Sequence, residues 1–315
     1  QGAAQRLSKR YRAETRDGVY AIKFYPRQDA DPRDRLGQEF AALELMGACG
    51  IGGIPKAYAR DSELGCAIYE WIDGKAPGKV TDGDVDAMSA LAKGLAAIEP
   101  SGAAAVGTAS AGCFSGADVT AQFSERLARL RAAADDDPAL NAFLVDRLEP
   151  SFAVLCRRAQ ELYAGAGVDF GAPLKPARRT LNPSDFGFHN ALRRADGTLV
   201  FLDFEYFGWD DPVKMIADAV WHPGSAMDAH AATRFRDAML DFFAARDGEA
   251  LRTRFEALSP LFGAIWCLIV LNEFLPERWA RRVAAGGTGN AAEARTRQLR
   301  SADALFTKVT TLYND

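Results

Sequence analysis

Polar residues in the second half of the chain are spaced in a way that suits metal-assisted chemistry. Asp185 and Asn190 lie five positions apart in one loop, and Asp203 follows an apolar, strand-like run at 199–202. In this order Asp185 can face an incoming hydroxyl as a catalytic base. Asn190 and Asp203 offer the amide and carboxylate oxygens that Mg²⁺ prefers as ligands. Transfer of a phosphoryl group from ATP requires such a base beside oxygen ligands for magnesium.

A lysine and a glutamate near the beginning of the chain supply the remaining parts. Lys23 ends an alternating, strand-like run at 19–23, and Glu39 lies in the helical pattern that follows. An ion pair between them would hold the ammonium group for contact with the α- and β-phosphates of ATP. Glu44 lies on the same predicted helix and is the alternative partner of Lys23.

The segment 1–73 has the pattern of a small sheet with one helix. Apolar residues recur at helical spacing over 33–46, where Gly47 and Gly50 are expected to end the helix. Short β-type runs predict strands at 11–14, 19–25, 54–58 and 66–71. The Gly- and Pro-rich stretch 73–78 marks a change in composition and is the predicted hinge between two lobes.

The second predicted lobe, 74–315, is mainly helical. Helical periodicity covers 87–98, 120–133, 138–163 and most of the chain beyond 232. The apolar run 261–275 is too short to span a bilayer and predicts a buried helix. Among these helices, one predicted hairpin with its turn at Asp196-Gly197 comes just before Asp203.

Composition excludes several classes of function. The 315 residues carry a formal charge of −4, which gives no basic footprint for nucleic acid. The five cysteines are odd in number and form no C-x-x-C pair, so neither a disulfide framework nor a zinc site is indicated. The first residues carry no apolar signal core. We expect a cytoplasmic protein with no membrane partner.

Together these motifs resemble those of the aminoglycoside phosphotransferase and choline kinase family. The resemblance extends from Tyr11 to about Trp221, and the matching motifs are Val19–Lys23, Ser184–Asn190, Leu202–Glu205 and Asp211-Pro212 with Asp218. It implies an α+β, bilobal, protein-kinase-like fold with a small N-terminal antiparallel-sheet lobe and a larger, mainly helical C-terminal lobe. It also implies ATP and Mg²⁺ as cofactors and a small-molecule hydroxyl as acceptor.

The resemblance assigns further residues. Tyr69–Ile72 would be the connector whose backbone pairs with adenine, so Glu70 and Ile72 are predicted to bind the nucleotide. Asp211 is expected to cap a helix, and His189 to pack within its loop. Glu273 lies in an apolar helix, where an unpaired carboxylate is costly to bury, and is the candidate that hydrogen-bonds the acceptor.

The letters Asp185-Phe186-Gly187 spell the D-F-G motif of the metal-binding loop in protein kinases. If they had that role, the catalytic Asp and its Asn should lie about twenty residues upstream. That stretch offers only Asp169, with Leu174 five positions later. Asp203, in contrast, follows a strand at the expected interval. We therefore assign the base to Asp185 and the metal to Asp203.

Two segments depart from the family pattern. Pro183-Ser184 replaces the usual His-Gly before the catalytic aspartate, so the sequence does not specify how the loop is braced. The phosphate-covering turn has one candidate, Gly2-Ala3-Ala4-Gln5. These departures suit an alternative, a degenerate kinase fold that binds a nucleotide or ligand without catalysis. The intact Lys, Asp, Asn and Asp set favours an enzyme.

A protein kinase is disfavoured, because Asp211-Pro212 follows Asp203 too closely to leave room for an activation segment ending in Ala-Pro-Glu. The sequence does not identify the acceptor, which could be an aminoglycoside, an amino alcohol or a sugar-like molecule. It does not indicate the oligomeric state either.

Overall fold

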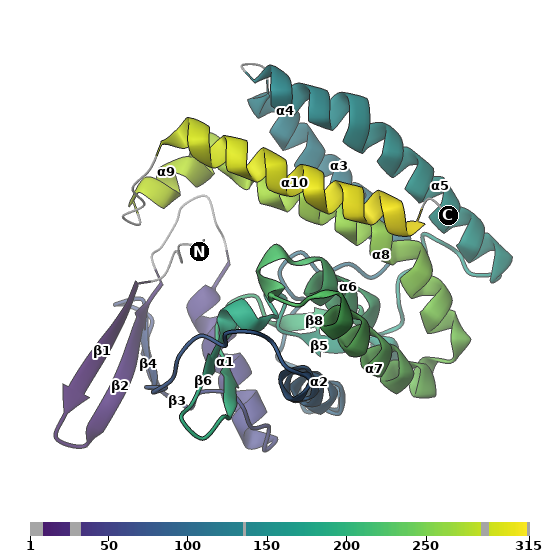
Figure 1. Ribbon diagram of the computed structural model, residues 1–315. Coiled ribbons are helices and arrows are strands. Elements are labelled where there is room, and N and C mark those ends of the chain that lie inside the picture. Colours follow the sequence, from purple (N-terminus) through teal and green to yellow (C-terminus); the bar gives the residue numbers. More distant parts are fainter. Residues whose placement is uncertain (1–8, 26–32, 135–136, 285–289, 314–315) are drawn as a thin grey trace. The chain divides into compact units, whose positions relative to one another are not determined.

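The chain forms two compact units, each built from two segments. Unit 1 contains Gln1–Gly112 and Lys175–Phe242, and unit 2 contains Cys113–Leu174 and Phe243–Asp315. The computed structural model describes residues 9–25, 33–134, 137–284 and 290–313 (Figure 1). The candidate phosphate-covering turn at 2–5 lies outside these residues. The predicted boundary at residue 73 falls inside unit 1, and the division into 1–73 and 74–315 stays a prediction.

Unit 1 contains a four-stranded antiparallel sheet in the order β1-β2-β4-β3 (Figure 1). Its strands are β1 Lys9–Thr15, β2 Gly18–Phe24, β3 Ala57–Asp61 and β4 Cys66–Glu70. The β1–β2 turn closes at Gly18, whose φ of +147° favours glycine. In the resulting register Arg10 lies opposite Lys23.

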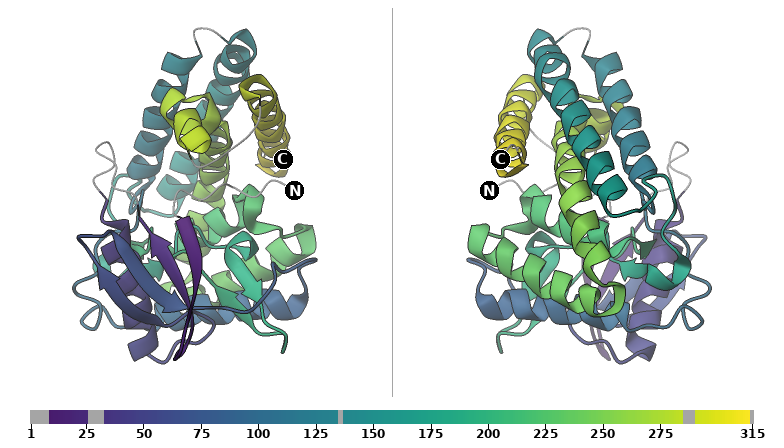
Figure 2. Two further views of the ribbon diagram at one scale, coloured as in Figure 1. Left: turned by 90° about the vertical axis from the view of Figure 1, so that its left-hand side faces the viewer. Right: turned by 90° about the vertical axis from the view of Figure 1, so that its right-hand side faces the viewer.

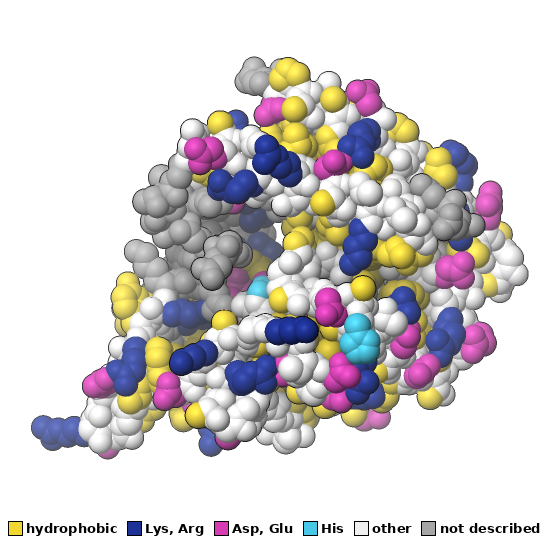
Figure 3. All heavy atoms as spheres, in the orientation of Figure 1, with side chains coloured by type: hydrophobic (Ala, Val, Ile, Leu, Met, Phe, Trp, Pro, Cys, Tyr) yellow, Lys and Arg dark blue, Asp and Glu magenta, His cyan; other side chains and the backbone are white. Residues whose placement is uncertain are grey.

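The outer surface of this sheet carries exposed aromatic side chains. The rings of Tyr11 and Phe24 meet edge to face, with centroids 5.7 Å apart. Around the region of β1 and β2, hydrophobic side chains lie among basic and acidic ones (Figure 3).

Helix α1, Arg35–Ala48, packs against β3 and β4. Asp34 caps it by accepting a hydrogen bond from the Gly37 N–H at 2.8 Å. The predicted apolar face is buried, and Glu39 is buried with it at 4% exposure. Gly47 lies inside the last turn, one residue earlier than the actual end of the helix.

The rest of unit 1 consists of helices and short antiparallel strand pairs. The helices are α2 Asp82–Ala96, α6 Pro212–Trp221 and α7 Ala229–Asp247, and the last residues of α7 belong to unit 2. The 3₁₀ turns are η2 Pro176–Arg178, η3 Phe188–Asn190 and η4 Pro223–Ser225. The predicted hairpin is formed by β6 Ala191–Arg193 and β7 Leu199–Phe201. A second pair, β5 Thr180–Asn182 with β8 Gly208–Asp210, was not predicted.

Unit 2 is helical in its described residues. Its elements are α3 Gly116–Ala133, α4 Pro138–Ala142, the π-helical η1 Phe143–Leu148, α5 Glu149–Gly165, α8 Glu249–Val270, η5 Leu271–Phe274, α9 Pro276–Ala284 and α10 Ala291–Tyr313. Helix α8 contacts α3, α5 and α10 (Figure 2). This packing supplies the buried helix that the apolar run predicts.

Helix α8 is longer than the apolar run from which it was predicted. By length and composition alone, Glu249–Phe274 is the one helix among the described residues that could cross a membrane. Its most apolar window is 72% buried inside the protein, as in the core helix of a soluble protein. Its hydropathy is therefore weak support for a membrane span.

Asp84 links the beginning of α2 to the β6–β7 hairpin. Its Oδ2 accepts hydrogen bonds from the Thr81 N–H and from Arg193 Nη2, each at 2.8 Å. Burial alone would raise the pKa of Asp84, but the hydrogen bonds from Arg193 and Thr81 outweigh it and lower the pKa. Asp84 therefore stabilises the fold as a carboxylate.

We expect Asp84→Ala to reduce the free energy of unfolding by about 2 kcal/mol, because it removes hydrogen bonds to a charged group. The stabilisation is present above the ordinary carboxyl pKa of about 4 and is lost as pH falls through the lower folded-state pKa. Denaturant unfolding at pH 7 and pH 3 measures both effects. Asp86→Ala is the control, because its exposed pair with Arg234 should contribute about 0–1 kcal/mol. Equal losses in the two variants would contradict the prediction.

Candidate active site

Lys23 lies buried among three carboxylates. Its Nζ is 2.6 Å from Asp203 Oδ1 and 3.5 Å from Glu205 Oε2, and it donates a hydrogen bond to Glu39 Oε2. Burial alone would lower the pKa of Lys23, but the three carboxylates outweigh it and raise the pKa. The structure thus brings Lys23, Glu39 and Asp203 together. Glu44, the alternative partner, is exposed.

Two tyrosines hold Glu39 in place. Tyr25 Oη donates to Glu39 Oε2 at 2.7 Å, and it lies 2.7 Å from Tyr69 Oη. Burial, reinforced by the Glu39 carboxylate, raises the pKa of both tyrosines, so their hydroxyls keep their protons. Sequence reasoning missed this role because aromatic residues in a strand usually indicate only the core.

Asp203 engages a second cation as well as Lys23. Its Oδ2 lies 2.8 Å from Arg10 Nη2, so both carboxylate oxygens accept from cations on the neighbouring strands β1 and β2. Burial alone would raise the pKa of Asp203, but Lys23 and Arg10 outweigh it and lower the pKa. The backbone of Asp203 has a φ of +72°, in the left-handed region that favours glycine. Such strain is typical of functional sites.

The carboxylates around Lys23 offer oxygens of the kind that a hard divalent cation prefers, and the ammonium group lies among them. Glu39, Asp203 and Glu205 each offer an oxygen, and these oxygens lie within 4.8 Å of one another. Burial raises the pKa of Glu205, and its Oε2 accepts no hydrogen bond from the described residues. Oxygen donors in such a cluster match the preference of Mg²⁺. Sequence reasoning did not single out Glu205 as a candidate ligand.

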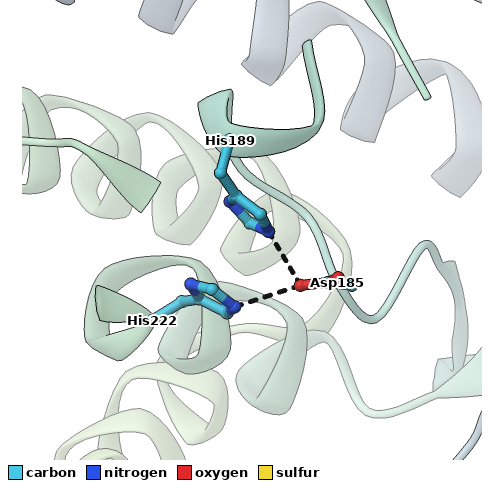
Figure 4. Close-up of side chains that lie close together, drawn as sticks. All are labelled: Asp185, His189 and His222. Carbon is cyan, nitrogen blue, oxygen red and sulfur yellow. Dashed lines mark hydrogen bonds and ion pairs between the residues drawn. The ribbon is translucent and has the colours of Figure 1, made fainter. Parts of the chain in front are cut away.

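The Asp185 carboxylate accepts hydrogen bonds on both of its oxygens. Figure 4 shows the two histidines that contact one of them. Nε2 of His189 and Nε2 of His222 lie 2.9 and 3.0 Å from Oδ1, and Asn190 Nδ2 donates to Oδ2 at 3.0 Å. Burial alone would raise the pKa of Asp185, but the hydrogen bonds from the two histidines outweigh it and hold the pKa well below its usual range. Asp185 is therefore a carboxylate at neutral pH.

Asn190 is oriented by the same contacts. Its Nδ2 donates to the main-chain oxygen of Asp185 as well as to the carboxylate, both at 3.0 Å. The amide oxygen therefore lies on the opposite side of the group from Asp185. This orientation agrees with the prediction that the Asp185 carboxylate faces the acceptor while the Asn190 amide oxygen faces a metal ion.

His189 and His222 extend the predicted site. His189 was expected to pack within its loop, and it also contacts Asp185. Sequence reasoning missed His222, which lies beyond α6. One signal was available in the sequence: the chain has only three histidines. The structure places two of them at Asp185.

Polar contacts from β5, β8 and the segment between Asp203 and β8 brace the loop that carries Asp185. Ser184 has a φ of +68°, and its Oγ donates to the main-chain oxygen of Tyr206 at 2.9 Å. Its N–H donates to Asn182 Oδ1, and Asn182 Nδ2 donates to Asp210 Oδ2, both at 2.9 Å. These bonds hold the loop at the position where Pro183-Ser184 departs from the family pattern.

A buried ion-pair network continues from Asp210 into α6. Lys214 Nζ lies 3.3 Å from Asp210 Oδ2 and 2.5 Å from Asp218 Oδ2. Asp211 caps α6 as predicted, because its Oδ1 accepts from the Val213 N–H at 2.8 Å. Asp210, Asp211 and Asp218 are thus part of the scaffold around the loop.

The remaining predicted residues lie at β4 and in unit 2. Glu70 ends β4 and pairs with Arg194 at 2.6 Å, and Ile72 is buried. Glu273 lies in η5, where its N–H donates to Gln298 Oε1 at 3.1 Å. The role of Glu70 and Ile72 at adenine and that of Glu273 at the acceptor stay predictions.

Comparison with known proteins identifies one family model and several similar folds. The model of the phosphotransferase enzyme family matches residues 2–258. No curated protein sequence matches significantly. Among solved structures, choline kinase LicA from Streptococcus pneumoniae is 18% identical, with a TM-score of 0.51 over 95% of this chain and 89% of that one.

Two further structures have the same fold. Spectinomycin phosphotransferase, solved with ADP and spectinomycin, is 11% identical, with a TM-score of 0.59 over 97% of this chain and 91% of that one. Plasmodium vivax ethanolamine kinase is 13% identical, with a TM-score of 0.54 over 96% and 83%. The predicted α+β, protein-kinase-like fold is confirmed, with a small antiparallel sheet and a mostly helical remainder.

We expect Lys23→Met to reduce the free energy of unfolding by about 3–5 kcal/mol, because it leaves buried carboxylates without their cation. Thermal and denaturant unfolding measure the loss. Arg10→Met is the matched control. Arg10 is more exposed than Lys23, and its replacement removes one ion pair, which should lower the free energy of unfolding by about 1 kcal/mol. A Lys23→Met variant as stable as the control would show that the cluster does not depend on the ammonium group.

Proposed function

Because the chain belongs to the phosphotransferase enzyme family, we propose that it transfers the γ-phosphoryl group of ATP to a hydroxyl of a small molecule, with Mg²⁺ as cofactor. The observation that carries the proposal is the buried contact of Lys23 with both Glu39 and Asp203. Lys23 comes from β2, Glu39 from α1 and Asp203 from the segment two residues beyond β7. Phosphoryl transfer gives a reason to bring them together.

Lys23 would contact the α- and β-phosphates of the nucleotide. Glu39, fixed by Tyr25, would keep the ammonium group in place as the phosphates compete with Asp203 for it. Glu70 and Ile72, at the end of β4 and just beyond it, would bind adenine through their backbone. A nucleotide is supported by the fold relatives solved with ADP or AMP.

Asp203 and Asn190 would hold Mg²⁺ through a carboxylate and an amide oxygen. When bound, Mg²⁺ neutralises charge on the β- and γ-phosphate oxygens. Asp185 would accept a hydrogen bond from the acceptor hydroxyl and take its proton as the acceptor oxygen bonds to the γ-phosphorus and the bond from that phosphorus to the oxygen of ADP breaks. Its lowered pKa makes it a weak base, which suits a loose transition state in which positioning contributes most of the rate.

We expect Asp203→Ala to abolish magnesium-dependent phosphoryl transfer, and Asp185→Asn to lower the rate by at least about 10². A screen of hydroxylated acceptors in an ADP-release assay first identifies a substrate. Asp196→Ala, in the exposed β6–β7 turn, is the matched control and should keep wild-type activity. An active Asp203→Ala variant would contradict the metal assignment. ATP binding without turnover of any acceptor would favour the non-catalytic binding module.

We expect Glu273→Gln to raise KM for the acceptor about tenfold, as the loss of one charged hydrogen bond predicts. KM for ATP should stay unchanged. Glu277→Gln in the same unit is the control, because Glu277 forms an exposed pair with Arg129. An unchanged acceptor KM and rate would remove Glu273 from the proposed acceptor site.

A further inference from the structure

Two stacked imidazole rings converge on one oxygen of Asp185. His189 belongs to η3, and His222 lies at the C-terminal end of α6. Their ring centroids are 4.2 Å apart and the ring planes differ by 11°. Both rings direct Nε2 at Asp185 Oδ1, at 2.9 and 3.0 Å (Figure 4). Two segments separated by more than thirty positions therefore meet at a single atom.

The protonation of His222 follows from its other nitrogen. The Gly224 N–H donates to His222 Nδ1 at 2.8 Å, so Nδ1 is an acceptor and carries no proton. A neutral imidazole then carries its proton on Nε2. His222 is therefore set to donate a hydrogen bond to Asp185.

The same contact disfavours a metal ion at this cluster. Asp185, His189 and His222 are close enough to share a metal. A metal on His222 Nε2 would need the lone pair of that nitrogen, while the Gly224 N–H already occupies the lone pair of Nδ1. The ring would then lack a proton on either nitrogen. Hydrogen bonds from the two histidines to Asp185 explain why the three side chains lie together, and they do not require a doubly deprotonated imidazole.

Two glycines leave just enough room for the rings. A Cβ at Gly187 would lie 2.8 Å from His189 Nδ1. A Cβ at Gly224 would lie 2.8 Å from His222 Cε1 and 3.1 Å from His189 Cγ. Any larger residue would displace an imidazole, so the backbone on both sides is fitted to this stacked pair.

We propose that His189 and His222 are positioning residues that anchor Oδ1 of Asp185 and so direct Oδ2 toward the acceptor hydroxyl. Rotation about the terminal torsion of an aspartate is otherwise broadly allowed. The hydrogen bonds from His189 and His222 to Oδ1 fix this torsion, and Asn190 Nδ2 occupies one lone pair of Oδ2. The remaining lone pair of Oδ2 faces the substrate. This inference rests on the proposed function.

The hydrogen bonds are testable without turnover. Histidine labelled with ¹⁵N gives signals from three residues, of which His230 is exposed and pairs with Asp82. Long-range ¹H–¹⁵N spectra should show His222 with its proton on Nε2. Asp185→Ala should shift the His189 and His222 signals and leave those of His230 unchanged. A proton on His222 Nδ1, or His189 and His222 signals that ignore Asp185→Ala, would overturn the proposal.

The effect on catalysis separates positioning from folding. We expect His222→Leu to lower kcat about 10–100-fold and to change KM for ATP less than about twofold, because it misplaces the base without touching the nucleotide. His222→Gln retains an N–H donor and should recover most of kcat. His189→Leu should resemble His222→Leu, and thermal unfolding confirms that each variant is folded.

A wild-type kcat in both leucine variants would overturn the proposal, as would a glutamine variant no better than leucine. If no acceptor is phosphorylated but the histidine spectra are as expected, the proposed function fails. The anchoring of Asp185 is still supported in that case, because the spectra report it directly.

Discussion

The burial of the Lys23 ammonium group is the constraint on which unit 1 depends. A buried cation is costly unless carboxylates compensate it at short range. Compensation here requires Glu39 from α1 and Asp203 from just beyond β7. The sheet, the helix and the segment after the hairpin must therefore meet at one point. The left-handed backbone of Asp203 is a further cost of this arrangement. A buried cluster of this cost is weak evidence for a role in stability alone, and it agrees with the proposed role in binding phosphate.

The charged groups around Lys23 are paired with one another in a way that would let them change partners when a nucleotide and a metal ion bind. Arg10 neutralises Asp203 from β1, and Arg35 lies 3.8 Å from Glu205. Incoming phosphates would attract the cations, and a divalent ion would attract the carboxylates, so each charge exchanges one partner for another. The free-energy cost of removing these charges from water is already met when the protein folds. Preorganised charges contribute to catalysis in this way, because they need no reorganisation during the reaction. The Asp185 carboxylate is held differently, by hydrogen bonds from His189, His222 and Asn190.

Sequence reasoning predicted the parts whose signals are local. The strands of the small antiparallel sheet and the β6–β7 hairpin follow from periodicity and turn chemistry, and the cap formed by Asp211 follows from the family resemblance. The assignment of the base to Asp185, against its D-F-G letters, stays a prediction. It missed His222, Arg10 and the β5–β8 pair, because each acts through contacts between segments distant in the chain. The bracing of the loop at Ser184 was also invisible, since it depends on Asn182 and Tyr206 meeting there. Long-range polar contacts have no periodic signature in one sequence.

The most direct test of the central claim is a crystal structure with Mg²⁺ and a non-hydrolysable ATP analogue. The proposal predicts Mg²⁺ about 2.1 Å from an oxygen of Asp203 and from the amide oxygen of Asn190. It also predicts Lys23 Nζ on the phosphates, still paired with Glu39, and Asp185 facing the γ-phosphate with its Oδ1 held by both histidines. A nucleotide bound away from Lys23, or a metal bound without Asp203, would contradict the account.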